Sequence, residues 1–226
     1  MHDGQNLFDN LHAFGSEWGI DETLNAEEGK VVVIGIENGA GQRMAEYMLH
    51  DHPEHCMAEG ALYLKDICEI IMPDVDSLLC TKSGRENTSI AGSSMGGLIS
   101  LYAGLYFPHL FGTVGIFSPA IWLDLPSIFT EVQAVAMKNM SGWESNSAQR
   151  WYFYAGTRET ETLVAEVETM VTIFRQYPQM EVTYQIDAGG IHDEAVWKNY
   201  FPEFYTWLIE KKPSELLELE SDIKIV

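Results

Sequence analysis

Short apolar runs alternate along the chain with segments in which apolar residues recur every three or four positions. Runs of strand length, several of them rich in β-branched or aromatic residues, lie at 30–37, 87–93, 112–120, 150–157 and 180–187. Helical spacing of apolar residues covers 59–79, 95–106, 162–177 and 193–212. Continuous apolar strands are typical of sheets buried on both faces. The alternation therefore predicts an α/β fold, a mostly parallel sheet with helices on both faces.

The length and the pattern fit a single domain over residues 1–226. Residues 121–149, which contain "WLDLP" and "KNMSGWESNS", are the least regular part of the pattern. We interpret them as a small insertion over one end of the sheet, where an active site would lie. Pro73 interrupts the helical spacing of 59–79 and is expected to break or bend that helix.

The charge of the chain limits which ligands it can bind, and its cysteine content indicates its cellular compartment. The chain has 34 acidic and 13 basic residues, a net charge of −21. Such a field repels nucleic acid and anionic membranes; it favours neutral or cationic ligands, or serves solubility alone. No apolar run is long enough to span a bilayer, and the first residues lack the features of a signal peptide. The three cysteines form no CxxC pair, so we expect reduced thiols in a cytoplasmic protein.

The stretch "IAGSSMGGLIS" at 90–100 has Gly92, Ser94 and Gly96 at G-x-S-x-G spacing, between an expected strand and an expected helix. A sharp strand-to-helix turn lifts a serine above the sheet, and crowding in that turn demands small residues two positions away on each side. A serine hydroxyl also needs a base and oxyanion donors before it acts as a nucleophile. The context favours Ser94 as a catalytic nucleophile over a structural serine in a turn.

A base should follow this serine along the chain, and only His109 and His192 do. His109 closes the next helix and fits a helix-dipole partner. His192 follows the last strand on a glycine-rich loop, where ligands collect in such sheets, and is the predicted base. The acid that orients it should follow an intermediate strand. Glu159 is preferred and Glu161 and Asp187 are alternatives, although both glutamates would also suit the start of a helix.

The oxyanion donors are expected to be backbone N–H groups. Met95 follows the serine at the helix N-terminus and supplies the first. The segment "HDGQN" at 2–6 is the candidate for the second, because Gly4 lets the backbone approach a substrate closely.

Three other features resemble metal-binding, nucleotide-binding or substrate-pocket motifs, and for most of them we prefer a structural role. "LHDHPEHC" at 49–56 collects zinc-type ligand residues, but the cluster is local and shows no distant partner, so a solvated loop near the active-site rim is preferred. "GIENGAG" at 35–41 lacks the lysine and the spacing of nucleotide-binding loops. Trp122 and Trp143 are candidates to line a pocket for an acyl or sugar group, whereas Trp18 fits the core. We therefore expect no metal and no cofactor.

Six segments carry a family resemblance: "MHDGQNLFD", "EWGIDETL", "GRENTSIAGSSMGGLISLYAGL", "GIFSPAIW", "YFYAGTRE" and "GGIHDEAVW". In this order they resemble the putative esterase family of α/β-hydrolases, which includes esterase D-like proteins, enterochelin esterases and feruloyl or acetyl-xylan esterases. The resemblance covers nearly the whole chain and implies a metal-independent serine esterase that forms an acyl-enzyme. It assigns the nucleophile to Ser94, the acid to Glu159, the base to His192 and the second oxyanion donor to Gln5.

One feature departs from that family. A buried central strand usually precedes the oxyanion loop, and edge strands precede that one, but here the sequence starts inside the "MHDGQN" motif, so these N-terminal strands are missing. An unfilled slot between 30–37 and 87–93 would leave backbone groups unpaired. The sequence is then shortened relative to a full gene product, or the sheet closes up, or another chain supplies a strand, as in a homo-oligomer.

The predicted function is hydrolysis of a small-molecule carboxylic ester. A peptidase or a thioesterase is the alternative within enzymes, because the same triad serves all acyl transfers. A non-catalytic or impaired binding protein with the same fold is the alternative from another class.

Overall fold

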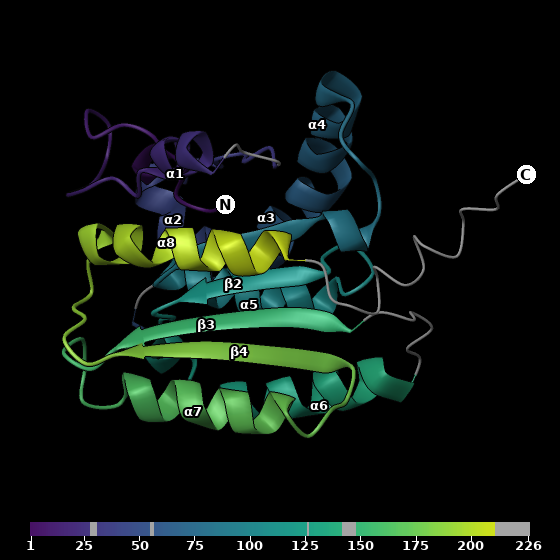
Figure 1. Cartoon of the computed structure of the whole chain (residues 1–226). Helices are drawn as coiled ribbons and strands as arrows, with labels where there is room; N and C mark the ends of the chain where they lie inside the picture. Colours follow the sequence, from purple (N-terminus) through teal and green to yellow (C-terminus); the bar gives the residue numbers. More distant parts are fainter. Residues whose placement is uncertain (28–30, 55–56, 126, 142–147, 211–226) are drawn as a thin grey trace, which may run out of the picture.

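The computed structural model describes residues 1–27, 31–54, 57–125, 127–141 and 148–210, with only the backbone described for 139–141. Its centre is a parallel sheet with the strand order β1-β2-β3-β4. The strands are β1 (Ser89–Ser93), β2 (Thr113–Phe117), β3 (Gln149–Gly156) and β4 (Met180–Asp187). Because the strands are parallel and follow one another, all four carboxyl ends meet at the same edge of the sheet (Figure 1).

Helices cover both faces of this sheet, so the α/β expectation is confirmed. The helices are α1 (Ile20–Ala26), α2 (Arg43–Glu46), α3 (Gly60–Asp66), α4 (Met72–Leu79), α5 (Met95–Tyr106), α6 (Ser127–Ser141), α7 (Leu163–Phe174) and α8 (Glu194–Ile209). Helices α5, α6 and α7 lie on one face and α8 on the other (Figure 1). None of these described helices combines the length and the apolar character that crossing a membrane requires.

The core divides into two layers because successive strand residues point to opposite faces. Trp151 and Phe153 pack with α5, α6 and α7. Tyr152 and Tyr154 pack on the other face, against the aromatic side of α8 that includes Phe204. The alternation along β3 therefore explains why a single strand carries four fully buried aromatic side chains.

The residues predicted for 59–79 form a helical segment that Pro73 perturbs, as expected. Helix α3 passes through a π-helical segment, Ile67–Ile71, into α4, and Pro73 is the second residue of α4. Proline has no N–H to donate to the carbonyl four residues earlier, and a π-helical turn is a common response to such an interruption. The helix continues, but with an altered twist at this point.

Two segments differ from the prediction. Residues 127–141, for which the pattern indicated no regular element, form helix α6. Ile128, Val132 and Ala136 recur at every fourth position and are fully buried, so a helical signal was present in the sequence. Residues 31–37 form no strand, and one isolated parallel bridge joins Ile36 to His2. A β-branched run becomes a strand only when a neighbour supplies a full row of hydrogen bonds, and here the neighbour is short.

That neighbour is the N-terminal segment. Residues 1–4 occupy part of the position between β1 and 31–37 at which a further strand was expected. The His2 N–H donates to the Ala91 carbonyl of β1 at 3.0 Å. On its other side, the Gly4 N–H donates to the Ile36 carbonyl at 2.8 Å, and the Ile36 N–H donates to the Met1 carbonyl at 2.9 Å. Residues 1–4 therefore stand between β1 and the segment around Ile36, where a central strand would end.

Beyond Met1 the slot continues as a cavity of about 200 Å³. Its lining is mostly apolar and includes Val33, Ile90 and Phe204. Ser89, which also lines it, has no backbone partner on this side in the described part of the chain. The Met1 α-amino group donates to the Ile34 carbonyl at 2.6 Å, and burial lowers its pKa to about 5. Mostly apolar side chains therefore line this part of the sheet position.

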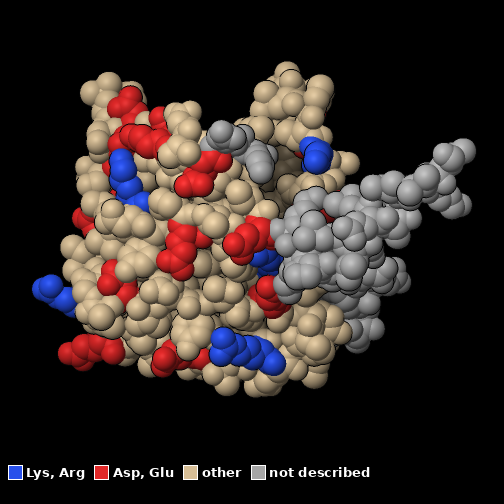
Figure 2. All heavy atoms as spheres, in the orientation of Figure 1, with Lys and Arg blue, Asp and Glu red and all other residues tan. Residues whose placement is uncertain are grey.

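The surface charge follows the composition. On the face seen in Figure 2, acidic side chains are scattered between uncharged residues and do not gather into one patch. This distribution fits a role of the negative charge in solubility.

Candidate active site

Ser94 lies in the turn between β1 and α5 with φ 56° and ψ −122°, a conformation that L-residues rarely adopt. The Ser94 N–H donates to the Phe117 carbonyl at 2.9 Å, and the Ala120 N–H donates to the Ser94 carbonyl at 3.0 Å. A Cβ atom on Gly92 would lie 2.6 Å from the carbonyl oxygen of Gly96, so the first glycine is sterically required. The geometry is that of a strained strand–serine–helix turn held by neighbouring loops.

His192 and Glu159 meet at the same edge of the sheet. His192 Nδ1 lies 2.7 Å from Glu159 Oε2, although the residues are 33 positions apart. The Glu159 carboxylate has no exposed surface, and the other oxygen, Oε1, accepts the Gly156 N–H at 2.6 Å. The imidazole is 43% exposed on one side and packs edge-on against Trp197 on the other. A fixed carboxylate therefore holds Nδ1, and Nε2 has no hydrogen-bond partner among the described residues.

The alternatives to this pair are engaged elsewhere. Asp187 accepts the Tyr154 hydroxyl at 3.1 Å and the Gly189 N–H at 3.0 Å. Glu161 is exposed, and in the described chain no contact joins it to His192. His109 follows the far end of α5. This helix of 12 residues places that end about 18 Å from Ser94.

Ser94 and His192 both lie where strands of the sheet end at their carboxyl termini. Among the described residues, no hydrogen bond links the Ser94 hydroxyl to His192. Hydrogen bonds between catalytic groups often tighten only when a substrate is bound. Ser94 follows β1, Glu159 follows β3 and His192 follows β4, so a strained serine and a carboxylate-bound histidine lie at the carboxyl ends of strands in one parallel sheet.

The expected oxyanion donors differ in their availability. Met95 is the first residue of α5, and its N–H has no backbone acceptor in the described chain. The Gly4 N–H is committed to the Ile36 carbonyl, whereas that of Gln5 is not engaged by any described backbone group. A Cβ on Gly4 would lie 2.6 Å from the Gly35 carbonyl carbon. Gly4 therefore serves the close approach of two backbones, and Gln5 retains the free donor.

Asp3 fixes the loop of residues 2–6, which carries the Gln5 N–H. Arg43 Nε and Nη2 donate to the two Asp3 carboxylate oxygens at 2.8 Å each, and Asn38 Nδ2 donates to Oδ1 at 2.7 Å. Burial alone would raise the pKa of Asp3, but the Arg43 and Asn38 interactions hold it below its ordinary value. A bidentate ion pair thus anchors residues 2–6 from a distant part of the chain.

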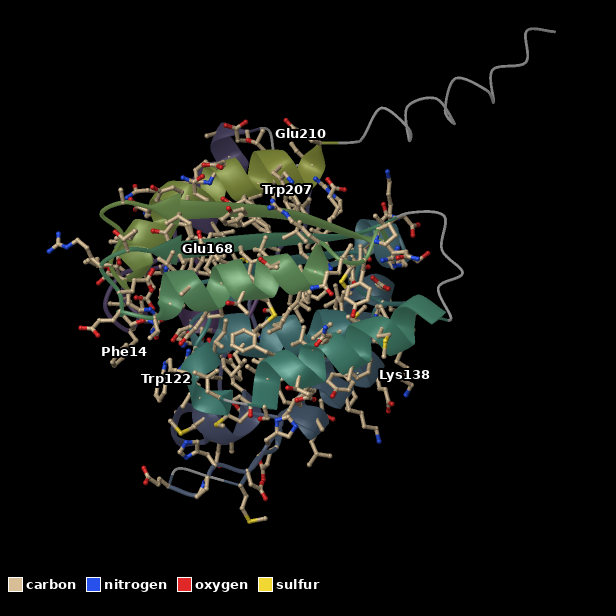
Figure 3. The ribbon with its side chains drawn as sticks, turned by 90° about the horizontal axis from the view of Figure 1, so that it is seen from below. Phe14, Trp122, Lys138, Glu168, Trp207 and Glu210 are labelled. Carbon is tan, nitrogen blue, oxygen red and sulfur yellow. The ribbon has the colours of Figure 1, made fainter. Side chains whose placement is uncertain are left out.

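Two of the three tryptophans considered from the sequence are described. Trp122 is 55% exposed and lies at the end of the molecule where Phe14 also projects into solvent (Figure 3). Trp18 is buried against Phe117 and Trp197, as expected of a core residue. Trp143 lies outside the described residues.

Sequence reasoning missed Ser118, which follows β2 with φ 45° and is fully buried. Its hydroxyl donates to Glu159 Oε1 at 2.7 Å and accepts the Trp197 Nε1–H at 2.8 Å. Ser118 therefore links the indole that packs on His192 to the carboxylate that binds it. A polar residue directly after a buried strand, in "GIFSPAIW", was the signal that could have identified it.

Comparisons with known proteins identify the family of the chain. The family model described as "Putative esterase" matches residues 1–208. Protein YbbA of Bacillus subtilis is 23% identical over 202 residues, which cover 83% of this chain and 76% of YbbA. The iron(III) enterobactin esterase of Escherichia coli O6:H1 is 27% identical over 159 residues, 68% of this chain and 39% of that esterase. The chain thus spans much less than the full length of the named esterase.

The fold also matches solved structures. The BES protein from Bacillus cereus superposes with a TM-score of 0.74 at 16% identity, covering 93% of this chain and 81% of that one. At this identity the likeness concerns the fold alone. Together with the family match over almost the entire described chain, it shows that the protein belongs to the Putative esterase family of carboxylic ester hydrolases, with an α/β-hydrolase fold.

Proposed function

We propose that the protein hydrolyses small carboxylic esters through Ser94, His192 and Glu159. The Ser94 hydroxyl attacks the ester carbonyl while His192 Nε2 accepts its proton and then returns it to the leaving alcohol. Glu159 holds the imidazole through Nδ1 and stabilises its charged form. The N–H groups of Met95 and Gln5 stabilise the oxyanion, and water then cleaves the acyl-enzyme.

The observation that carries the proposal is the 2.7 Å contact between His192 Nδ1 and Glu159 Oε2 beside the strained serine turn. Labelling with a fluorophosphonate separates the two classes of function, because the probe reacts only with an activated serine. We expect stoichiometric labelling at Ser94 together with hydrolysis of short p-nitrophenyl esters. An intact, folded chain that neither labels nor hydrolyses would favour a non-catalytic binding protein.

For the substrate class, we propose esters of the enterobactin type. The support is the named iron(III) enterobactin esterase, which is similar over 68% of this chain. Exposed Trp122, two residues after the Ala120 whose N–H binds the Ser94 carbonyl, offers an aromatic surface for such a substrate. Comparing kcat/KM for enterobactin, a feruloyl ester, a p-nitrophenyl ester, a thioester and a peptide tests this assignment. A preference for the thioester or the peptide would assign the same triad to one of the alternative acyl-transfer reactions.

We propose further that residues 1–226 act as one domain of a cytoplasmic protein.

We also propose that a second copy of the chain covers the cavity next to Met1. Open backbone groups and apolar walls at a sheet position recruit another chain. Val32 lines this cavity and is more than half exposed. We therefore expect light scattering to report a homo-oligomer, and we expect Val32→Lys to shift it toward the monomer.

A matched variant controls for the loss of an exposed apolar residue. Leu11 is exposed and does not line the cavity, so Leu11→Lys should leave the oligomer unchanged. A wild-type monomer that is active and unfolds in one cooperative transition would contradict the proposal, because the sheet would then be complete without a second chain.

A further inference from the structure

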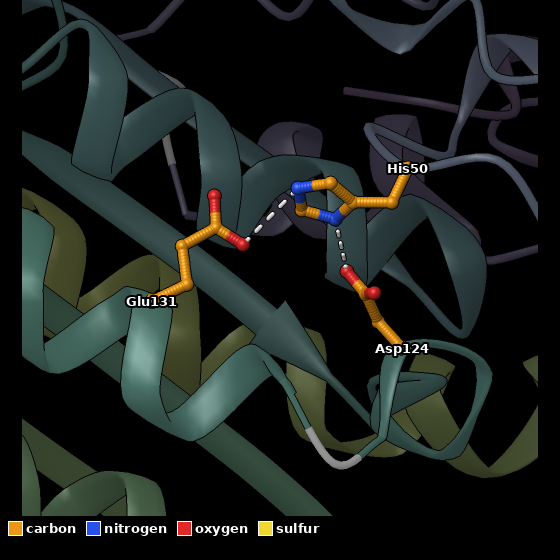
Figure 4. Close-up of side chains that lie close together, drawn as sticks. All are labelled: His50, Asp124 and Glu131. Atoms are coloured by element: carbon orange, nitrogen blue, oxygen red, sulfur yellow. Dashed lines mark hydrogen bonds and ion pairs between the residues drawn. The ribbon is translucent and has the colours of Figure 1, made fainter.

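A second polar cluster lies outside the triad and joins three distant segments. His50 lies in the loop after α2, Asp124 ends the 3-10 helix Ile121–Asp124, and Glu131 lies on α6. Figure 4 shows the imidazole between the two carboxylates. The sequence "LHDHPEHC" offered His50 no distant partner, and the fold supplies two. His55 and Cys56 of that motif lie outside the described residues.

The distances within this cluster fit a metal ion. His50 Nε2 lies 3.3 Å from Glu131 Oε2, and Nδ1 lies 2.9 Å from Asp124 Oδ2. One ligand atom from each residue lies within 4.8 Å of the others. Around a tetrahedral zinc ion with bonds of about 2.1 Å, ligand atoms are roughly 3.4 Å apart. The His50–Glu131 pair already has that separation. Asp124 contacts the other ring nitrogen, so an ion bound through Nε2 requires the Asp124 side chain to turn from Nδ1 toward the ion.

Hydroxyl groups outside the cluster orient its carboxylates. The Tyr102 hydroxyl donates to Asp124 Oδ2, and the Tyr106 hydroxyl donates to Glu131 Oε1. Ser127 adds a weaker contact to Asp124 Oδ1 at 3.4 Å. Outer hydrogen bonds of this kind fix the direction of metal-binding carboxylates and are typical of metal sites.

The charge of the cluster also favours a cation. Asp124 is buried and Glu131 is half-buried, and within the described chain His50 is the only residue that forms an ion pair with either. The two carboxylates carry more negative charge than a single imidazole can balance even when it is protonated, and burying uncompensated charge is costly. The imidazole is 45% exposed, so an ion can enter from solvent.

We propose that His50, Asp124 and Glu131 bind one divalent cation, with Zn²⁺ the best match to one nitrogen and two carboxylate ligands. Three protein ligands leave the fourth position to water. The ion would tie the loop at His50 to the segment that follows Ala120, whose N–H holds the Ser94 turn. This assignment is independent of the proposed function and differs from the metal-free expectation drawn from the sequence.

Titration of the chelator-treated, full-length protein with ZnCl₂, followed by calorimetry, tests the proposal. We expect one equivalent to bind and to raise the melting temperature. His50→Gln and Glu131→Gln should each weaken binding at least about a hundredfold, and Tyr106→Phe, which keeps all three ligands, about tenfold. The matched control His109→Gln removes an exposed histidine elsewhere and should bind zinc as the wild type does.

Circular dichroism checks that each variant is folded, and Tyr106→Phe remains informative if a ligand variant is not. Absence of saturable zinc binding to the wild type would overturn the proposal. Unchanged binding in both His50→Gln and Glu131→Gln would also overturn it, because the ion would then be held elsewhere, for example by other residues of 49–56.

Discussion

Replacement of Ser94 by alanine is expected to abolish hydrolysis of a short-chain p-nitrophenyl ester while the protein stays folded. The serine supplies the nucleophile of the acyl-enzyme route, and removing it from a triad costs roughly a millionfold in kcat. The positive φ of Ser94 is tolerated by alanine no worse than by serine, so the turn should persist. Initial rates of ester hydrolysis and fluorophosphonate labelling measure the loss, and circular dichroism checks the fold.

Ser93→Ala provides a matched control one residue earlier. Ser93 ends β1 and is buried, and among the described residues its hydroxyl makes no hydrogen bond. This variant should retain labelling and most of the hydrolysis. Retention of more than a few per cent of activity in Ser94→Ala, after contaminating enzyme has been excluded, would refute the nucleophile assignment.

Loss of His192 should be about as damaging as loss of Ser94, because the base and the nucleophile act as one unit. His192→Ala is therefore expected to lower kcat by roughly a millionfold. Glu159→Gln keeps the size of the side chain but presents an amide in place of the carboxylate oxygen 2.7 Å from Nδ1. It should cost less, about ten-thousandfold, which is the scale for the acid of a triad. Steady-state kinetics on one ester compares the variants directly.

Glu161→Gln and Asp187→Asn are the matched controls for the acid. Neither residue contacts His192 in the described structure, and Asp187 is occupied by Tyr154 and Gly189. Both variants should keep kcat within a few-fold of the wild type. A silent Glu159→Gln combined with a severe loss in either control would show that the wrong carboxylate has been assigned.

Local patterns predicted much of the fold. The helix expected at 95–106 is α5 at Met95–Tyr106, and the strands expected at 150–157 and 180–187 are β3 and β4 within one residue. These elements carry strong periodicity, because each buries a continuous apolar face in a sheet covered on both sides. The strand expected at 30–37 failed for the opposite reason: its apolar run was clear, but its partner in the sheet extends over only a few residues.

The order of strands, glycine spacing and loop positions in the sequence were enough to select Ser94 and His192, since those features are local. The sequence favoured Glu159 but left Glu161 and Asp187 open, because all three are carboxylates at or soon after the end of a strand. Only the packing of β3 beside β4 brings Glu159 to 2.7 Å from His192 and commits Asp187 to Tyr154. Likewise, only the tertiary structure shows that the Gly4 N–H donates to the Ile36 carbonyl and that His50 lies beside Asp124 and Glu131. Such contacts join segments tens of residues apart, so their distances depend on how the whole sheet and its helices pack, which no local pattern encodes.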